Sequence, residues 1–121
     1  MNILIVDDSR AMRSIVRRML RMAGFSGHCI EEASNGAEAL GLIKEHQPGL
    51  VMCDFNMPEM NGLQLLEDLK RNGIPSQFGF VTSEASTELK DAAKAAGAVF
   101  VITKPFTQQV FEEVLGPVLS A

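Results

Sequence analysis

Polar side chains that could share one site follow four separate apolar runs of this sequence. The runs end at the pair Asp7-Asp8, at Asp54, at Thr82 and at Lys104. A short apolar run that ends this way is typical of a buried parallel strand, and ligands bind at the carboxyl edge of such sheets. If the four strands lie in one sheet, three carboxylates, a hydroxyl and an ammonium group meet in one shallow cleft.

Three clustered carboxylates repel one another, so such a site costs free energy unless a cation occupies it. Mg²⁺ fits better than a softer metal, because the strand ends offer oxygen ligands and neither His nor Cys. Mg²⁺ usually shares its ligand shell with water and phosphate, which points to phosphoryl chemistry. Asp54 is then the nucleophile that accepts a phosphoryl group, and Asp7 and Asp8 hold the metal. Thr82 and Lys104 stabilise the transferring oxygens.

Hydrophobic periodicity predicts the elements that position these groups. Apolar runs predict strands over residues 3–6, 28–33, 50–53, 77–82 and 99–103. Helical spacing predicts helices within 9–24, over 37–46, 63–72 and 84–96, and after a cap at Thr107, the last one interrupted near Gly116-Pro117. This alternation predicts an α/β fold: a doubly wound, five-stranded parallel sheet in the flavodoxin-like order 2-1-3-4-5, with helices on both faces.

Length and composition limit the classes of protein that fit. The 121 residues suit one domain over 1–121, without a linker, a repeat or a low-complexity segment. The sequence contains no positively charged leader and no apolar segment of about 20 residues. We therefore expect a cytoplasmic protein that does not enter a membrane. The net charge of −4 argues against a nucleic-acid binder.

Several side chains are expected to have structural roles only. Cys29 and Cys53 lack CxxC spacing and a nearby histidine pair, so we expect two small, buried, apolar side chains. His28 and His46 are expected at the surface. On the second and third helices the spacing predicts these inward residues: Ala37, Leu40, Ile43, Leu63, Leu66 and Leu69.

The first predicted helix carries an unusual number of arginines on its polar face. They are Arg10, Arg13, Arg17, Arg18 and Arg21. One interpretation is a solvated amphipathic face, and the other is a docking surface for an acidic or phosphorylated partner. The sequence leaves both open.

The motifs at the strand ends resemble, in order and spacing, the receiver domains of bacterial two-component response regulators. The matching segments are Val6-Asp7-Asp8, Asp54 with Met57-Pro58-x-Met60-Asn61-Gly62, Thr82-Ser83 and Lys104-Pro105-Phe106. The resemblance covers the whole chain. It implies that Asp54 accepts a phosphoryl group from a histidine kinase, and that the Lys104-Pro105 peptide bond is cis. It also implies that Asp8, Asp54 and the backbone carbonyl of Asn56 bind Mg²⁺, with Asp7 holding its waters.

Within this family the chain resembles the stand-alone, CheY-like chemotaxis regulators. It carries Asn56 and Glu84 at the two positions that tune hydrolysis of the aspartyl phosphate in the family. The resemblance implies a monomeric switch that dephosphorylates itself and is not an enzyme. Its partners would be a histidine kinase or histidine phosphotransfer protein and a downstream protein. The downstream protein would bind the face formed by the fourth helix, fifth strand and fifth helix.

Other functions remain open at this stage. The chain could be a phosphorelay intermediate or phosphate sink that passes the phosphoryl group to a histidine phosphotransfer protein. It could also be a receiver-like scaffold that is never phosphorylated. A flavin carrier or an aspartate-nucleophile phosphatase fits less well, because Asp7-Asp8-Ser9-Arg10 is neither a phosphate loop nor a DxD motif.

One position departs from the family. Receivers usually have Tyr or Phe three residues before the lysine, where this chain has Val101, and its aromatic residue Phe100 comes one position earlier. Successive residues of a strand point to opposite faces, so Phe100 is not expected to replace that ring. We hypothesise that the switch runs through Thr82, the loop at 83–85 that begins with Ser83, and the fourth helix. Val101 and Pro105 complete the predicted switch region.

Overall fold

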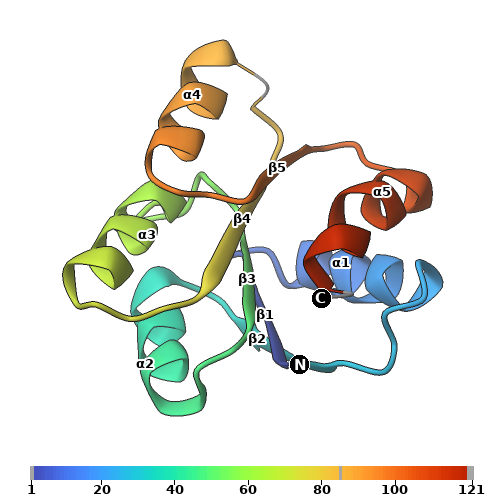
Figure 1. The fold of residues 1–121 in the computed structure, drawn as a ribbon, viewed down its shortest axis with the longest axis horizontal. Coiled ribbons are helices and arrows are strands. Elements are labelled where there is room, and N and C mark those ends of the chain that lie inside the picture. The colour runs from blue at the N-terminus through green and yellow to red at the C-terminus, as the bar shows by residue number, and fades with distance from the viewer. Residues whose placement is uncertain (1, 85, 120–121) are drawn as a thin grey trace.

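The computed structural model describes residues 2–84 and 86–119, in which strands and helices alternate along the chain (Figure 1). The strands are β1 (Asn2–Val6), β2 (Cys29–Ala33), β3 (Leu50–Cys53), β4 (Gln77–Thr82) and β5 (Phe100–Thr103). The helices are α1 (Arg10–Met22), α2 (Gly36–His46), α3 (Gly62–Arg71), α4 (Thr87–Ala95) and α5 (Gln108–Leu119). All strand pairs are parallel and the order is β2-β1-β3-β4-β5, which confirms the predicted fold.

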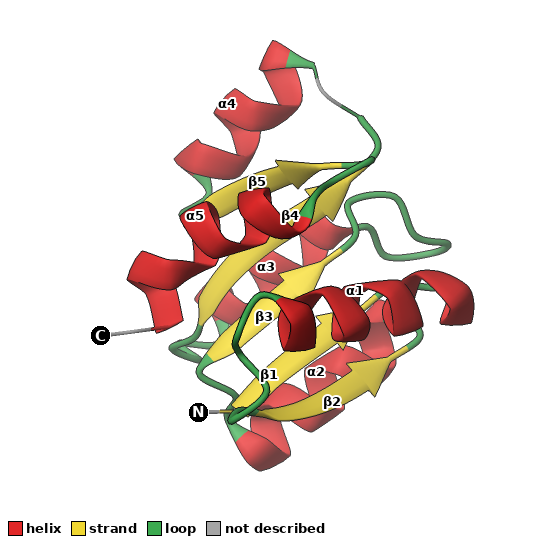
Figure 2. Ribbon diagram, turned by 90° about the vertical axis from the view of Figure 1, so that its right-hand side faces the viewer, coloured by secondary structure: helices red, strands yellow, loops and turns green. Residues whose placement is uncertain are grey.

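Helices cover both faces of the sheet, α1 and α5 on one and α2, α3 and α4 on the other (Figures 1 and 2). The alternation of side chains along each strand fills the two layers. On β1, Leu4 and Val6 pack toward α2 and α3, whereas Ile3 and Ile5 pack toward α1 and α5. Because β1, β3 and β4 are buried on both faces, packing from both layers determines where their carboxyl ends lie. Within the described ranges, no helix is long and apolar enough to cross a membrane.

Two predictions about the helices are wrong, whereas the other predicted bounds agree with the structure to within one or two residues. The fourth helix begins at Thr87 and not at 84, because the Ser86 hydroxyl caps it by accepting from the amide of Leu89. Glu84 therefore lies in the loop before α4. The last helix runs through Pro117 to Leu119 without the predicted interruption. Pro117 falls in its last turn, where the missing N–H costs one hydrogen bond and the helix ends two residues later.

Some burial predictions are also wrong. Cys29 is exposed because it begins β2, which is an edge strand of the sheet, whereas Cys53 is buried as expected. In α2, Ala39 is buried in place of Ala37, which is exposed. In α3, Leu65 joins the core beside Leu66 and Leu69, and Leu63 is only half-buried. His46 is exposed and bonds Glu31, and His28 is half-buried against Phe25.

Candidate acidic site

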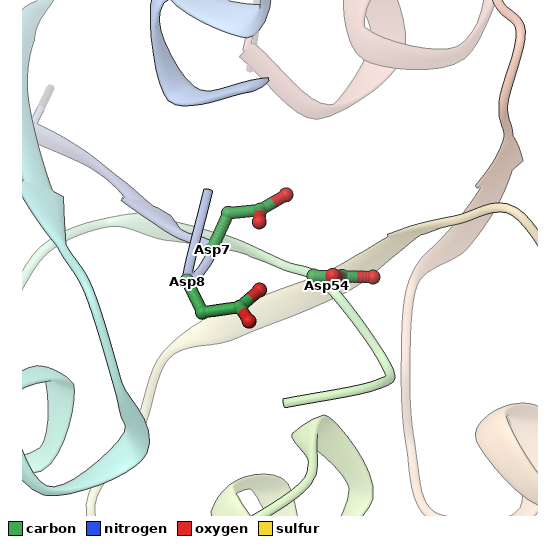
Figure 3. Close-up of side chains that lie close together, drawn as sticks. All are labelled: Asp7, Asp8 and Asp54. Carbon is green, nitrogen blue, oxygen red and sulfur yellow. The ribbon is translucent and has the colours of Figure 1, made fainter. Parts of the chain in front are cut away.

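Three carboxylates converge where β1 and β3 end. Val6 pairs with Cys53, so Asp7 and Asp54 leave neighbouring strands at the same level. Oxygen atoms of Asp7, Asp8 and Asp54 lie within 4.8 Å of one another, and the three side chains point into a common space (Figure 3). Asp7 is 4% exposed and the Asp54 side chain 12% exposed, whereas Asp8 faces solvent. The predicted carboxylate cluster therefore forms at the carboxyl edge of the sheet.

Lys104 brings a positive charge to the cluster from the far side of the sheet. Its Nζ lies 3.3 Å from Asp7 Oδ2 and 3.6 Å from Asp54 Oδ1. Its amide donates to the carbonyl of Thr82 (2.7 Å), which ties the end of β5 to the end of β4. The bond between Lys104 and Pro105 is cis, as the resemblance implies. One ammonium group faces three carboxylates, so the site keeps an excess of negative charge.

The backbone holds Asp54 in place. Its amide donates to the carbonyl of Val6 (2.8 Å), and the amide of Asn56 points at its carboxylate. Burial raises the pKa of Asp54 above its ordinary 3.8, and repulsion from Asp7 and Asp8 adds to this, while Lys104 and the Asn56 amide oppose the rise. The Asp54 carboxylate is therefore in a state that an added cation would stabilise. Burial also raises the pKa of the neighbouring Cys53 thiol, which stays protonated.

Thr82 is fully buried at the end of β4. Thr82 Oγ1 accepts from the amide of Glu84 at 3.1 Å, across the start of the loop that leads to α4. Ser83 and Glu84 are exposed, as is Asn56 in the loop after β3. Residue 85, the last of the predicted switch loop, lies outside the described residues. The structure thus gathers Asp7, Asp8, Asp54 and Lys104, and links Thr82 to the α4 loop.

Phe100 and Val101 lie on opposite faces of β5, as strand alternation predicts. Phe100 packs in the layer under α1 and α5, and its ring covers Gly79 on β4. A Cβ at position 79 would overlap three carbons of that ring. Val101 is half-buried in the layer of α3 and α4. The Phe100 ring therefore packs on the face of the sheet opposite α4.

Two glycine contacts that sequence reasoning missed hold the loop after β3. Gly62 donates to the carbonyl of Phe55 (2.9 Å), and a Cβ on Gly62 would lie 2.7 Å from the Asp54 carbonyl oxygen. The Met60 side chain covers Gly36 at the start of α2, where a Cβ would lie 2.6 Å from its sulfur. Gly62 permits a close approach to the backbone that a larger residue would prevent, whereas a larger residue at position 36 would require the flexible Met60 side chain to shift. The only sequence signal for this role of Gly62 is its place in the motif Met57-Pro58-x-Met60-Asn61-Gly62.

Lys104→Met is expected to destabilise the metal-free protein by about 2 kcal/mol at pH 7, because it removes the cation that faces Asp7 and Asp54. The loss should shrink as the pH falls through the raised folded-state pKa of Asp54, since the protonated Asp54 carboxyl no longer needs a cation. Urea unfolding at pH 7 and about pH 3.5 measures both values. Lys90→Met, at an exposed position of α4, is the control with the same charge change. Equal losses in both variants would contradict this account.

The sequence matches the response regulator receiver domain family over residues 3–115. With the parallel sheet and the acidic cluster, this match defines the class: the chain belongs to the response regulator receiver domains. Such domains are phosphoacceptors in signalling and bind Mg²⁺ in an acidic pocket, which here corresponds to Asp7, Asp8 and Asp54.

Chemotaxis regulators are among its relatives. The chain is 38% identical to chemotaxis protein CheY of Bacillus subtilis over 104 residues, 86% of this chain and 85% of that protein. It is 38% identical to chemotaxis protein CheY-3 of Vibrio cholerae over 117 residues, 95% of this chain and 88% of that protein. The solved structure of Vibrio cholerae CheY4 matches with a TM-score of 0.85 at 31% identity, over 98% of both chains. These likenesses confirm a CheY-like receiver.

A more distant match shows the fold alone. A DNA-binding response regulator of the LuxR family from Staphylococcus aureus gives a TM-score of 0.85 at 22% identity, over 97% of both chains. The same fold therefore occurs in receivers with different outputs, and the output of this chain must be argued from its own surface.

Proposed function

We propose that residues 1–121 form one receiver domain that takes a phosphoryl group on Asp54 from a phosphohistidine and then binds a protein partner. The observation that carries this is the Asp54 carboxylate at the end of β3, facing two further carboxylates and the Lys104 ammonium group. An Asp54 oxygen forms the new bond to phosphorus, and the phosphorus–nitrogen bond breaks. The imidazole of the donor leaves with its electron pair and is protonated.

We propose Mg²⁺ as the cofactor of this site. The donor atoms offered are all oxygens, and a bound cation would offset the burial and the carboxylate repulsion that raise the pKa of Asp54. Asp8, Asp54 and the carbonyl of Asn56 would hold the ion, and Asp7 would hold its waters. When bound, the ion neutralises charge on the transferring oxygens. Asn56 and Glu84, both exposed beside the site, are proposed to tune hydrolysis of the aspartyl phosphate.

We propose that the phosphodonor, a histidine kinase or a histidine phosphotransfer protein, docks on α1 beside the site. An apolar hollow of about 210 Å³ is lined by Met12, Ile15, Met19, Lys104, Pro105 and Phe106. Ile15 is 46% exposed there. Of the arginines on α1, Arg10, Arg18 and Arg21 are exposed and give this helix an excess of positive charge. An apolar patch on a basic helix, with Lys104 at its border, suits an amphipathic, acidic helix pair.

We propose that the downstream partner binds a surface formed by α4, β5 and α5. A groove of about 290 Å³ is lined by Lys90, Lys94, Ala98, Val99, Phe100 and Val101. Phosphorylation would draw the Thr82 hydroxyl away from the Glu84 amide and so release the loop before α4. The chemotaxis relatives support a partner in chemotaxis. If the chain were instead a phosphorelay intermediate, it would use the same site and the same α1 surface twice: to receive the phosphoryl group and to pass it to a histidine phosphotransfer protein.

The test is incubation with acetyl phosphate and Mg²⁺, with and without EDTA, followed by intact mass measurement. We expect a gain of one phosphoryl group that requires the metal and decays after the donor is removed. Borohydride reduction should then convert Asp54 alone to homoserine, which peptide mass spectrometry locates. A lack of phosphoryl gain under every condition would contradict the proposal and favour the scaffold alternative.

A further inference from the structure

Arg13 is partly buried beside the acidic site and does not belong to the solvated face of α1. Its side chain is 14% exposed. Its Nη1 donates to the backbone carbonyl of Asp7 at 2.6 Å, and its Nε donates to Glu32 Oε1 at 2.9 Å. One guanidinium group therefore joins α1 to the end of β1 and to the edge strand β2. Arg13 therefore departs from the interpretation of the arginine face as freely solvated.

Glu32 is shared by a second arginine that does not reach the site. Glu32 Oε2 accepts from Arg17 Nε at 3.0 Å, and Arg17 Nη2 donates to the carbonyl of Ile30 at 3.1 Å. Arg17 thus makes the same ion pair with Glu32 and a comparable bond to a backbone carbonyl. Its side chain is 37% exposed and its backbone partner lies on β2, away from the carboxylates. The two arginines differ mainly in which carbonyl they hold.

The carbonyl that Arg13 holds belongs to the peptide unit between Asp7 and Asp8. A peptide unit is planar, so fixing its oxygen fixes the plane that joins the two residues. The remaining polar groups of Asp7 are also bonded: its amide to the Ala33 carbonyl (3.1 Å), and its Oδ1 to the Ser9 amide (2.9 Å). The Arg13 guanidinium group adds a charged hydrogen bond to the backbone carbonyl of Asp7. It therefore places a positive charge next to the backbone that carries the Asp7 and Asp8 carboxylates.

We propose that Arg13 is a positioning residue: held by Glu32, it fixes the Asp7-Asp8 peptide and thereby raises the affinity of the acidic site for a divalent cation. The inference rests on the proposed use of this site for Mg²⁺. The planar guanidinium group donates in two directions at once, to Glu32 and to the Asp7 carbonyl. A lysine ammonium group keeps the charge but not this fixed geometry.

The test compares Arg13→Met with Arg17→Met. Both variants lose one ion pair to Glu32 and one bond to a backbone carbonyl, so both should unfold at a somewhat lower temperature. Only Arg13→Met is expected to weaken Mg²⁺ binding, by about tenfold, when the dissociation constant is measured by calorimetry. Arg13→Lys should recover part of the affinity. Glu32→Gln, which leaves Arg13 in place but weakens its anchor, should show a smaller loss.

A second measurement needs neither metal nor phosphate. Hydrogen exchange of the Ser9 amide, which donates to Asp7 Oδ1, is expected to speed up in Arg13→Met and not in Arg17→Met. The inference would be overturned if Arg13→Met and Arg17→Met bound Mg²⁺ equally well, or if the Ser9 amide exchanged equally fast in both. It would also be overturned if the wild-type protein bound no Mg²⁺. A wild type that binds Mg²⁺ but gains no phosphoryl group would instead overturn the proposed function, and the Arg13 comparison would still decide the inference.

Discussion

Asp54→Asn is expected to abolish the phosphoryl gain from acetyl phosphate completely and to make the metal-free protein more stable at neutral pH. The first effect follows because the amide offers no carboxylate oxygen to the phosphorus. The second follows from the raised pKa of Asp54, whose ionised form is disfavoured in the folded protein by burial and by Asp7 and Asp8. The gain in unfolding free energy at pH 7 should be about 1 kcal/mol.

The sign of the pH dependence is set by that raised pKa. A group with a raised folded-state pKa binds its proton more tightly in the folded protein, so its full contribution to stability is present below the unfolded pKa, ordinarily 3.8. That contribution is lost as the pH rises through the folded pKa. The advantage of Asp54→Asn over wild type should therefore be full at pH 7 and vanish below pH 3.8.

Thermal unfolding in EDTA at several pH values measures this difference, and intact mass measures the phosphoryl gain. Asp91→Asn, at an exposed position of α4, is the control with the same charge change and should alter neither quantity. Phosphoryl gain that persists in Asp54→Asn would assign the acceptor to Asp7 or Asp8. Stability that is lower than wild type at pH 7 would contradict the electrostatic account of the site.

Gly79→Ala is expected to destabilise the protein by about 3 kcal/mol, because the added methyl group overpacks a filled part of the core. The new Cβ would overlap the Phe100 ring, far inside contact distance. The ring has little room to move, since Phe100 is buried in the layer under α1 and α5 and Gly79 is itself buried in the sheet. Denaturant unfolding measures the loss.

A double-mutant cycle separates the clash from other effects of the methyl group. Gly79→Ala combined with Phe100→Leu should lose less stability than the sum of the two single changes, because the shorter side chain leaves room for the Cβ. Gly41→Ala is the matched control: a Cβ there meets no described atom within 4 Å, and alanine favours a helix by about 1 kcal/mol over glycine. Additive losses in the cycle would show that Phe100 does not cover Gly79.

The fold and the acidic cluster could be predicted from the sequence because both depend on local patterns. Apolar runs that alternate with helical spacing define the parallel sheet, and the polar residue after each run must lie at its carboxyl edge. Asp7, Asp8, Asp54 and Lys104 could therefore be grouped from their positions in the sequence alone. The role of Thr82 could be predicted only in part, since its position follows from β4 but its bond to the Glu84 amide depends on the course of the next loop.

Other features were decided by tertiary structure, because they depend on which surfaces face each other. Cys29 resembles a core residue in the sequence, but it is exposed because β2 lies at the edge of the sheet. Arg13 and Arg17 occupy the same face of α1, and only the packing of that helix beside β1 and β2 gives one of them the Asp7 carbonyl. The Phe100 ring fills the space above Gly79 because β4 and β5 are neighbours and Gly79 pairs with Phe100. Periodicity determines which face a residue takes, whereas the partner it meets there depends on chain segments far away in the sequence.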